Sequence, residues 1–409
     1  MKKAQHYNRS LFPSKDNELL VGGIKLTQLQ QRIGQTPFYA YDRQLITDRM
    51  AELRQQMPSD LKIHYAIKAN PMPALVQHMA TLVDGFDLAS ANEMKTALNT
   101  PMQAQNISFA GPGKRQEDIK QTIAAGVTLH VESVNELESI AKIEQEIAIP
   151  AHIAIRINPA FELKTSGMKM GGGAKPFGID EEQLPSLLKR VKTLNLNFKG
   201  FHIYSGSQNL KAESIIEAQQ QSFDLANKLS NHCSCPIEKL NIGGGFGIPY
   251  FPSEKPLNTK KVGDALNEMM DKFKVNHPQT EIIIELGRYL VGEAGVYVSQ
   301  IIDKKMSRNK TFLVVNGGLH HHLAASGNFG QVIRKNYPIA LGNKIQSSET
   351  EPVTIVGPLC TPLDVLGDKI FLPKAEIDDF VVVYQSGAYG YSASPHQFLS
   401  QAECIEALI

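Results

Sequence analysis

The sequence has few cysteines, no long apolar run and almost no net charge. Four cysteines among 409 residues are too few for a disulfide framework, so we expect a protein of the reducing cytoplasm. No apolar run is long enough to span a bilayer, and residues 1–6 lack the apolar segment of a signal peptide. A net charge of +1 gives no general attraction to nucleic acid. We therefore expect neither a membrane nor a nucleic-acid partner.

Two groups of potential metal ligands occur, and neither predicts a metal site. Cys233 and Cys235 have only His232 beside them as a further ligand, whereas a structural zinc site uses four. Residues 320–322 are three consecutive histidines. On a strand their side chains would alternate between faces, so they could not all bind one ion. We interpret this run as a solvated strand and expect no metal.

What the sequence does contain is a repeated pattern of short apolar runs. Its composition, 42% hydrophobic and 20% charged, allows a large core. Amphipathic helical patterns fill most gaps between the runs, as at residues 187–194. The runs are Lys62–Ala69, Gly85–Ser90, Asn106–Gly111, Leu129–Ser133, His152–Pro159, Phe198–Gly206, Lys239–Gly245 and Glu281–Gly287. Eight repeats of strand and helix predict an α/β fold, a (β/α)8 barrel with its chemistry at the carboxyl ends of the strands.

Two of the expected helices begin with a capping box. Ser90 precedes Glu93 by three residues, and Ser133 precedes Glu136 by the same spacing. In such a box the two side chains bind backbone amides that the first helical turn leaves without partners.

A second, β-rich region follows the barrel. After about residue 295 the helical periodicity gives way to short strands broken by glycine and proline, for example 311–315, 353–356 and 380–384. Residues 18–26 have a hairpin pattern with two glycines at the turn. We therefore divide the chain into N-terminal strands that join the β domain (1–35), the barrel (36–290) and a C-terminal β domain (291–409).

Polar residues lie in or at the ends of the expected barrel strands. They are Lys68, Asp87, Arg156, His202, the run Gly243–Gly245, Glu285 and Arg288. Lys68 closes the first strand, where burial would lower its pKa toward the neutral amine that attacks an aldehyde. A single lysine at a strand end is more often a solvated terminus, but the convergence of the other polar residues favours an active site.

Seven motifs in order resemble one family. They are Tyr65–Asn70, Gly85–Ser90, Gly200–Gly206, Asn241–Gly247, Glu285–Arg288, Gly357–Cys360 and Gly387–Tyr389. The family is that of the fold-type III pyridoxal-phosphate decarboxylases, which include the diaminopimelate, ornithine and arginine decarboxylases. The resemblance extends from Thr36 to Tyr389 and implies a barrel with a C-terminal β domain, as in alanine racemase, and pyridoxal 5'-phosphate as cofactor.

The resemblance also implies catalytic roles. Lys68 would form the Schiff base with the coenzyme, and His202 would stack on the coenzyme ring. Glu285 would hold the protonated ring nitrogen, which favours decarboxylation over the racemisation catalysed by relatives that place an arginine there. A strand-end salt bridge between Glu285 and Arg288 is the structural alternative.

Further groups would bind the phosphate and shape the site. By resemblance the phosphate ligands are Ser205, Gly243, Gly244, Gly245, Gly287, Arg288 and Tyr389. Asp87 would orient Lys68, and Arg156 would form the far wall of the site. Either of these two residues could instead belong to an ordinary structural ion pair.

Cys360 lies outside the barrel sequence. In the family the matching cysteine enters the active site of the other subunit and protonates the product, so the resemblance implies a homodimer with shared active sites. A lone buried cysteine is otherwise usually inert packing.

The departures from the family concern the substrate. Diaminopimelate decarboxylases follow this cysteine with glutamate and ornithine decarboxylases with aspartate, whereas this chain has Thr361, which cannot balance a distal ammonium. Asp364 could replace the missing acid. The Arg-Pro motif that clamps a distal carboxylate in diaminopimelate decarboxylases is also missing from residues 316–324.

The Cys-Thr-Pro-Leu-Asp pattern and the glycine-rich loop 168–178 are more similar to a biosynthetic-cluster branch. This branch includes decarboxylases of carrier-protein-linked glutamate, exosortase-associated decarboxylases and siderophore-pathway enzymes. The loop would be either a lid over a bulky substrate or a surface insertion. We predict a decarboxylase of a modified or carrier-linked amino acid. The alternatives are a diaminopimelate, ornithine or lysine decarboxylase and, more remotely, a coenzyme-binding regulator without activity.

Overall fold

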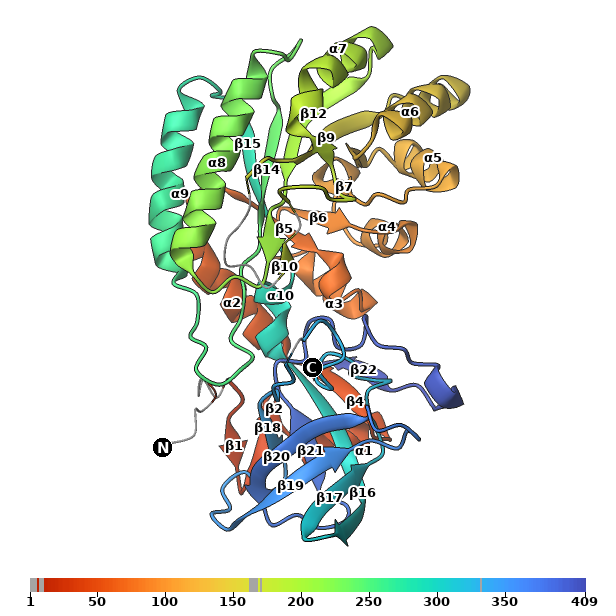
Figure 1. Ribbon diagram of the computed structural model, residues 1–409, viewed down its shortest axis with the longest axis vertical. Coiled ribbons are helices and arrows are strands. Elements are labelled where there is room, and N and C mark those ends of the chain that lie inside the picture. Colours follow the sequence, from red (N-terminus) through yellow and green to blue (C-terminus); the bar gives the residue numbers. More distant parts are fainter. Residues whose placement is uncertain (1–5, 7–10, 162–167, 170, 332) are drawn as a thin grey trace. The chain divides into compact units, whose positions relative to one another are not determined.

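The computed structural model describes residues 6, 11–161, 168–169, 171–331 and 333–409. It divides into two compact units (Figure 1). The barrel unit comprises Arg49–Ile248 and Pro256–Tyr289, and the β unit comprises Met1–Asp48, Pro249–Lys255 and Leu290–Ile409. Each unit is described separately below. In the described part of the chain, no helix is both long and apolar enough to cross a membrane.

The barrel unit is a closed parallel sheet. Its eight strands are β5 (Lys62–Ala66), β6 (Gly85–Leu88), β7 (Ile107–Phe109), β8 (Thr128–Val131), β9 (His152–Asn158), β12 (Asn197–Ile203), β14 (Lys239–Gly244) and β15 (Glu281–Leu286). Each strand pairs in parallel with the next, and the pairing of β8 with β9 closes the ring. The (β/α)8 prediction is confirmed, including all eight strands.

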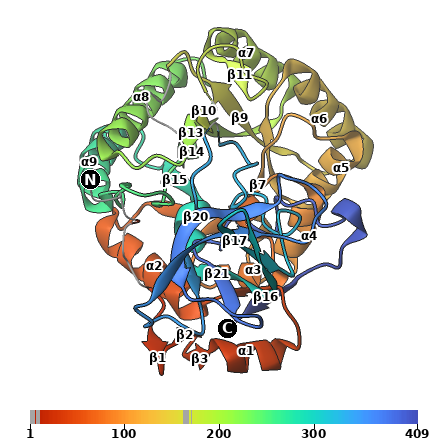
Figure 2. The same cartoon turned by 60° about the horizontal axis from the view of Figure 1, so that its bottom comes forward.

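Helices surround the strands, as Figure 2 shows. They are α2 (Arg43–Gln56), α3 (Pro73–Met79), α4 (Ala91–Leu98), α5 (Gln116–Ala125), α6 (Val134–Ile147), α7 (Leu184–Leu194), α8 (Ala212–Ser230), α9 (Thr259–Lys274) and α10 (Arg288–Val291). The strands are buried on both faces, since side chains fill the barrel and helices cover it. Short elements complete this unit: β10 (Met168–Lys169), β11 (Ile179–Asp180), β13 (Gly206–Ser207), η1 (Ile67–Ala69), η2 (Ala104–Asn106) and η3 (Glu181–Gln183).

Both predicted capping boxes form, with one difference. The Ser90 hydroxyl accepts from the Glu93 amide at 3.2 Å, as expected for a cap. The Glu93 carboxylate accepts from the Ala89 amide at 2.7 Å, one residue before the cap. The box at Ser133 is built in the same way. The carboxylates therefore fix the loop that enters each helix as well as the helix itself.

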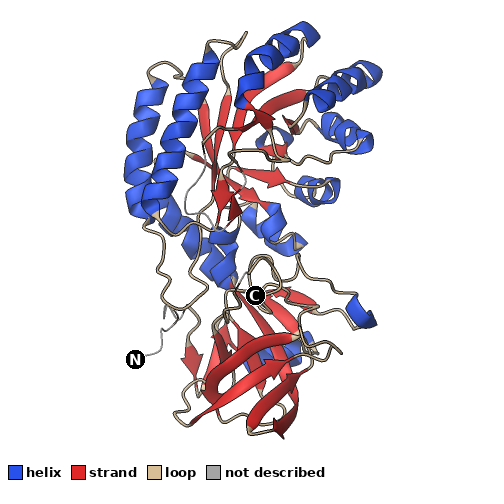
Figure 3. Cartoon of the chain, in the orientation of Figure 1, coloured by secondary structure: helices blue, strands red, loops and turns tan. Residues whose placement is uncertain are grey.

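The β unit contains most of the remaining strands (Figure 3). Its main sheet has the order β18-β21-β16-β17-β19-β20, and β4 pairs with β16 and β22. The bounds are β4 (Phe38–Tyr41), β16 (Gly295–Ser307), β17 (Lys310–Val315), β18 (Ile339–Leu341), β19 (Thr350–Val356), β20 (Val365–Pro373), β21 (Phe380–Val383) and β22 (Ile405–Leu408). Two short 3-10 turns, η4 (Gly292–Ala294) and η5 (Phe398–Ser400), also belong here.

The N-terminal strands form a small sheet of their own, β1 (Ser14–Lys15), β2 (Glu18–Val21) and β3 (Ile24–Lys25), followed by α1 (Leu26–Ile33). Leu19 and Val21 share a buried cluster with Phe38, Val296 and Phe380. The hairpin is thus anchored by apolar burial rather than by extension of the main sheet.

The unit boundaries differ from the sequence-based division at residues 36–48 and 249–255 and, by one residue, at Leu290, which lies in the β unit. Residues 36–48 lie in the β unit rather than in the barrel, because β4 pairs with β16 and β22. Pro249–Lys255 also lie in the β unit. The pairing of β4 with β16 and its pairing with β22 could not be deduced from local periodicity.

The three histidines at 320–322 were predicted as a solvated strand, and this is wrong. They lie in a turn, and each side chain is at most 1% exposed. The amides of His321 and His322 both donate to the carbonyl of Gly318, at 3.0 Å. The Tyr39 hydroxyl donates to the carbonyl of His321 at 2.7 Å.

Candidate active site

Lys68 lies just beyond β5 rather than in it. The strand ends at Ala66, and Lys68 occupies the 3-10 turn η1 (Ile67–Ala69). The turn is fixed at its end, where the Asn70 amide donates to the Ile67 carbonyl at 3.0 Å and the Tyr65 hydroxyl donates to the Asn70 carbonyl at 2.9 Å. The prediction of a continuous strand to Ala69 is therefore corrected, but Lys68 still lies at the carboxyl end of the barrel.

Glu285 and His202 meet inside the barrel. His202 Nε2 lies 3.3 Å from Glu285 Oε2, and both side chains are buried. Asn241 Nδ2 donates to the same carboxylate oxygen at 3.3 Å. Burial acts to raise the pKa of Glu285, but the interactions with His202 and the charge of Lys68 outweigh it and hold the pKa below its ordinary value. Glu285 is therefore an anion placed to stabilise a positive charge.

Asp87 behaves in the opposite way. Burial and the nearby charge of Glu285 raise its pKa well above the ordinary value. The Ser108 hydroxyl donates to its carboxyl group. His64 Nδ1 lies 3.6 Å away, and burial lowers the pKa of His64 to about 3, so its imidazole is neutral. The pKa shifts of the two neighbouring acids are therefore opposite, since that of Asp87 is raised and that of Glu285 is lowered.

Arg156 belongs to a buried ion pair. Its Nη1 donates to Glu132 Oε1 at 2.9 Å, and its guanidinium carbon lies 5.2 Å from the centre of the Phe177 ring. Glu132 also accepts from the Gly178 amide at 3.1 Å. The sequence left open whether Arg156 forms a structural ion pair, and Glu132 is the partner in such a pair. Glu132 was missed, although it follows β8 at the same end of the barrel as the other polar residues.

The glycine run Gly243–Gly245 comprises the last two residues of β14 and the residue after it, and we call this run the cradle. Gly243 has a φ of +68°, and a Cβ there would come within 2.8 Å of the Ile203 carbonyl oxygen. Asn241 Oδ1 accepts from the Gly243 amide at 2.8 Å, which ties the cradle to the residue that contacts Glu285. Asn241 stands in a motif recognised from the sequence, but its role there was missed. Closely spaced amides of this kind suit an anionic group such as a phosphate.

Gly287 links the end of β15 to the lysine turn. A Cβ at Gly287 would lie 2.7 Å from the Cβ of Ala69. Any larger residue would therefore separate β15 from the turn that carries Lys68. Arg288 follows as the first residue of α10, and Ser205, which is buried, follows β12.

The glycine-rich loop after β9 is held by Asn158, in addition to the bond from Gly178 to Glu132 and the pairing of β10 with β13. Asn158 Nδ2 donates to the Gly173 carbonyl at 2.8 Å, and the Gly172 amide donates to Asn158 Oδ1 at 3.1 Å. Residue 170 of this loop lies outside the described residues. The lid stays a prediction.

The residues predicted from the β unit have different surroundings. Cys360 is exposed, as is required of a thiol that acts outside its own fold. Asp364 is buried, and its two oxygens accept from the amides of Leu319 at 2.6 Å and Leu359 at 2.8 Å. The carboxylate therefore joins two loops, which is not the substrate role considered for it. Thr361 accepts from the Leu363 amide at 3.3 Å.

Tyr389 lies in a loop with a constrained backbone. Its φ is +54°, in the left-handed region. Just before it, the Ser386 amide donates to the Gly295 carbonyl at 2.9 Å and the Gly387 amide donates to the Gly292 carbonyl at 3.0 Å. These bonds fix the loop to the start of β16.

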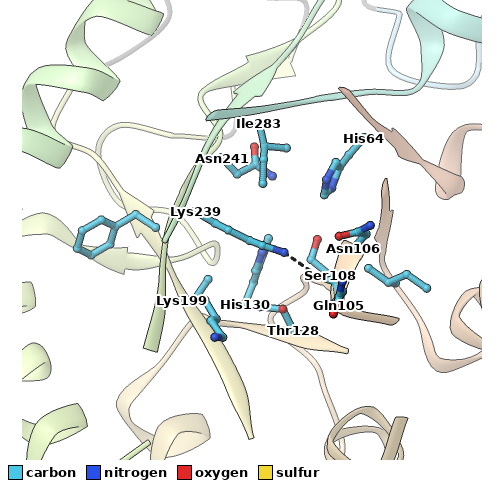
Figure 4. A pocket seen from close by; sticks show the side chains of 13 residues that line it. His64, Gln105, Asn106, Ser108, Thr128, His130, Lys199, Lys239, Asn241 and Ile283 are labelled. Carbon is cyan, nitrogen blue, oxygen red and sulfur yellow. Dashed lines mark hydrogen bonds between the residues drawn. The ribbon is translucent and has the colours of Figure 1, made fainter. Parts of the chain in front are cut away.

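A small cavity lies in the barrel away from Lys68 (Figure 4). Its lining includes His64, Ser108, His130, Lys239 and Asn241. Lys239 Nζ donates to the Gln105 carbonyl at 2.6 Å. Because Lys239 and Thr128 begin their strands, the cavity belongs to the amino-terminal half of the barrel. It shares His64, Ser108 and Asn241 with the surroundings of Asp87 and Glu285, whereas Lys68 is not part of its lining.

At one end, this closed parallel barrel carries the turn with Lys68, the Glu285 carboxylate and the glycine run Gly243–Gly245. This combination fits a pyridoxal-phosphate enzyme. Comparison with known proteins agrees. Residues 43–292 match the family described as pyridoxal-dependent decarboxylase, pyridoxal binding domain. The chain belongs to this family of pyridoxal-phosphate-dependent decarboxylases.

Several relatives are similar over nearly the whole chain. L-glutamyl-(BtrI acyl-carrier protein) decarboxylase of Niallia circulans is 38% identical over 94% of this chain and 91% of its own. Diaminopimelate decarboxylase of Aquifex aeolicus is 30% identical over 97% and 91%. Among solved structures, diaminopimelate decarboxylase of M. jannaschii superposes with a TM-score of 0.87 at 27% identity, over 97% of this chain and 92% of that one.

Proposed function

We propose that this enzyme removes the α-carboxylate of a modified or carrier-linked amino acid in a specialised biosynthetic pathway, such as that of a siderophore. The relative named for carrier-linked glutamate is more similar, at 38% identity, than the diaminopimelate decarboxylase at 30%. A further relative, 28% identical over 92% of the chain, is named 2-((L-alanin-3-ylcarbamoyl)methyl)-2-hydroxybutanedioate decarboxylase of Staphylococcus aureus. Both names describe amino acids with a large substituent.

One structural observation carries the proposal about the substrate. Asp364 is the only acid in residues 357–364, and both of its oxygens are bound to backbone amides. Its neighbour Thr361 is neutral. A distal ammonium group would therefore find no available carboxylate in this segment, and leaving such a charge unpaired is costly.

The barrel residues support a division of labour in the reaction. Pyridoxal phosphate, when bound, supplies a sink for the electrons that remain on the α-carbon when carbon dioxide leaves. Lys68 would hold the coenzyme covalently, and the amides of Gly243–Gly245 with Ser205, Gly287 and Arg288 would bind its phosphate. Glu285, kept anionic by its surroundings, would hold a proton on the ring nitrogen. His202, which lies beside it, would cover one face of the ring.

Other roles rest on the sequence resemblance alone. We propose Tyr389 as a phosphate ligand and Cys360 as the thiol that protonates the α-carbon in the partner subunit of a homodimer. Sedimentation of a fully active monomer would rule out the shared site. A cytoplasmic location is proposed from the cysteine content.

The two alternative functions make different demands on the site. A diaminopimelate or basic amino acid decarboxylase needs a charged group for the distal end of its substrate, which Asp364 does not offer in its present contacts. A regulator without activity would not need Lys68, Glu285 and Cys360 together. The general similarity to diaminopimelate decarboxylase structures favours the first of these.

The test is carbon dioxide release by the purified protein with pyridoxal phosphate. The substrates are meso-diaminopimelate, L-lysine, L-ornithine, L-arginine and carrier-linked L-glutamate, with Lys68→Ala as the blank. We expect release from the carrier-linked substrate and little from the free diamino acids. Turnover of free meso-diaminopimelate at about ten per second or more, a typical enzymatic rate, would overturn the proposal.

A further inference from the structure

The β unit contains a group of metal-ligating side chains that the decarboxylase chemistry does not use. One ring nitrogen each from His321 and His396 and the sulfur of Cys404 lie within 4.8 Å of one another. His321 lies in the buried turn before residue 323, His396 in the segment after β21, and Cys404 immediately before β22. Three segments distant in sequence therefore place two imidazoles and one thiol together.

The hydrogen bonds of the two histidines fix which nitrogen can bind an ion. His321 Nε2 lies 2.8 Å from the Ala402 carbonyl oxygen, and His396 Nε2 lies 2.7 Å from the Tyr391 carbonyl oxygen. Since a carbonyl only accepts, both Nε2 atoms carry the proton, and each Nδ1 carries a lone pair. Histidine ligands in proteins are usually oriented in this way, by a carbonyl on the other nitrogen.

The two Nδ1 atoms have little else to bind. His396 Nδ1 is buried and has no hydrogen-bond partner among the described residues. His321 Nδ1 has the Tyr297 hydroxyl at 3.4 Å, at the long limit for a hydrogen bond. The adjacent His320 has a buried Nδ1 without a partner as well, and its ring centre lies 3.7 Å from that of His321.

We propose that His321, His396 and Cys404 form a site for a single thiophilic divalent cation such as Zn²⁺. Two nitrogens and one thiolate are ligands that zinc prefers, and a fourth position stays open for water or another ligand. Zinc ligands lie about 3.3 to 3.6 Å apart at ordinary bond lengths, so the side chains need to close by about 1 Å. Binding forms a bond from the metal to Cys404 Sγ and releases the thiol proton to solvent.

The surroundings of the three ligands suit the bound ion, because a divalent cation with one thiolate and two neutral imidazoles has a net positive charge. Glu403 and Glu406 flank Cys404 in the chain and act electrostatically on its side chain. The same carboxylates would offset part of the charge of a bound ion. Cys404 and His321 are buried, whereas His396 is only partly so, which gives the ion a way in. The sequence predicted no metal, because it compared only residues adjacent in the chain.

The test is a Co²⁺ titration of the purified enzyme saturated with pyridoxal phosphate, with Zn²⁺ as competitor. We expect one Co²⁺ per chain and a near-ultraviolet band from thiolate-to-cobalt charge transfer, which Zn²⁺ abolishes. Cys404→Ser should lose the band. His396→Gln, a change at a half-buried side chain that the fold should tolerate, should weaken binding about 100-fold or more. The matched control is Cys233→Ser with Cys235→Ser, which removes the other pair of neighbouring thiols and should leave the band unchanged.

Circular dichroism and the coenzyme absorbance establish that each variant is folded, and if Cys404→Ser does not fold, the decision rests on His396→Gln. The proposal is contradicted if the wild type binds no Co²⁺. It is equally contradicted if the band survives in the folded Cys404→Ser variant, if His396→Gln binds as tightly as the wild type, or if the control pair loses the band.

Discussion

Polar side chains that are buried or half-buried serve different purposes in the two units. In the barrel, Lys68, Asp87, His202 and Glu285 come from or follow four different strands and influence one another's charge. In the β unit, Asp364 and the Ser386 loop bind backbone groups of neighbouring loops. The first arrangement is the one that we propose for catalysis, and the second holds irregular loops in place by hydrogen bonds. Substitutions should therefore reduce activity in the first region and stability in the second.

The largest expected effect is on activity, from Lys68→Ala. Loss of the amine that we propose holds the coenzyme should lower carbon dioxide release by about 10,000-fold or more, with little change in the free energy of unfolding. Lys239→Met is the matched control, because this lysine lies in the other half of the same barrel. An equal loss of activity in both variants would mean that general disruption, not Schiff-base chemistry, explains the effect.

Arg156→Met tests a buried ion pair of the barrel unit for which we expect an effect on stability. Its loss leaves the Glu132 carboxylate buried without its cation, which should cost about 3 to 5 kcal/mol in the free energy of unfolding. Denaturant titration measures this. Adding Glu132→Gln to Arg156→Met should recover much of the loss, since the charge is gone; no recovery would show that lost packing dominates.

The two neighbouring acids should respond differently to neutral replacement. Glu285→Gln removes the negative charge that we propose acts on the coenzyme ring. It should lower kcat by about 100- to 1,000-fold, as loss of one electrostatic stabiliser does in other active sites. Asp87→Asn replaces an acid whose raised pKa favours the neutral form, and it should lower kcat by about tenfold or less. Steady-state kinetics of both variants decide; equal losses would contradict the assignment of the proton to Asp87.

The raised pKa of Asp87 also predicts how the free energy of unfolding depends on pH. Its pKa is raised above 3.8 in the folded state, so folding requires this group to bind a proton at higher pH. Its contribution to stability therefore falls as pH rises above 3.8. The free energy of unfolding of Asp87→Asn relative to wild type should increase between about pH 4 and about pH 8. A difference independent of pH would show that Asp87 ionises normally.

The smallest effect is expected from Asp364→Asn. An amide oxygen accepts but its nitrogen cannot, so one of the two backbone bonds is lost, at about 1 to 3 kcal/mol in the free energy of unfolding. If the substitution instead abolishes turnover without loss of stability, Asp364 contacts the substrate after all.

The sequence predicted the barrel site better than the β unit for a physical reason. In a parallel barrel the carboxyl ends of all strands meet, so Lys68, His202 and Glu285 could be brought together from strand order alone. Glu132 and Asn241 follow the same rule, but a glutamate in a loop and an asparagine before glycines carry no distinct signal. The end of β5 at Ala66 could not be predicted either, because Ile67 and Ala69 suit a strand and a turn equally.

The irregular loops of the β unit follow no such rule. The histidines at 320–322 were expected in a solvated strand because polar residues usually lie outside. Their burial depends on Tyr39, Ser386 and Ala402, which are distant in sequence and bind them by hydrogen bonds. The group of His321, His396 and Cys404 was not predicted for the same reason, because these residues are also distant in sequence. Contacts of this kind follow from the tertiary fold alone.

The most direct test of the proposed substrate class is a competition in one vessel. The enzyme receives equal concentrations of carrier-linked L-glutamate and free meso-diaminopimelate, and the two products are quantified at low conversion, which gives the ratio of the two kcat/KM values. We expect the carrier-linked product to exceed the other by about 100-fold or more, since an unpaired distal ammonium would cost several kcal/mol. A ratio near one, or an excess of product from diaminopimelate, would contradict the account.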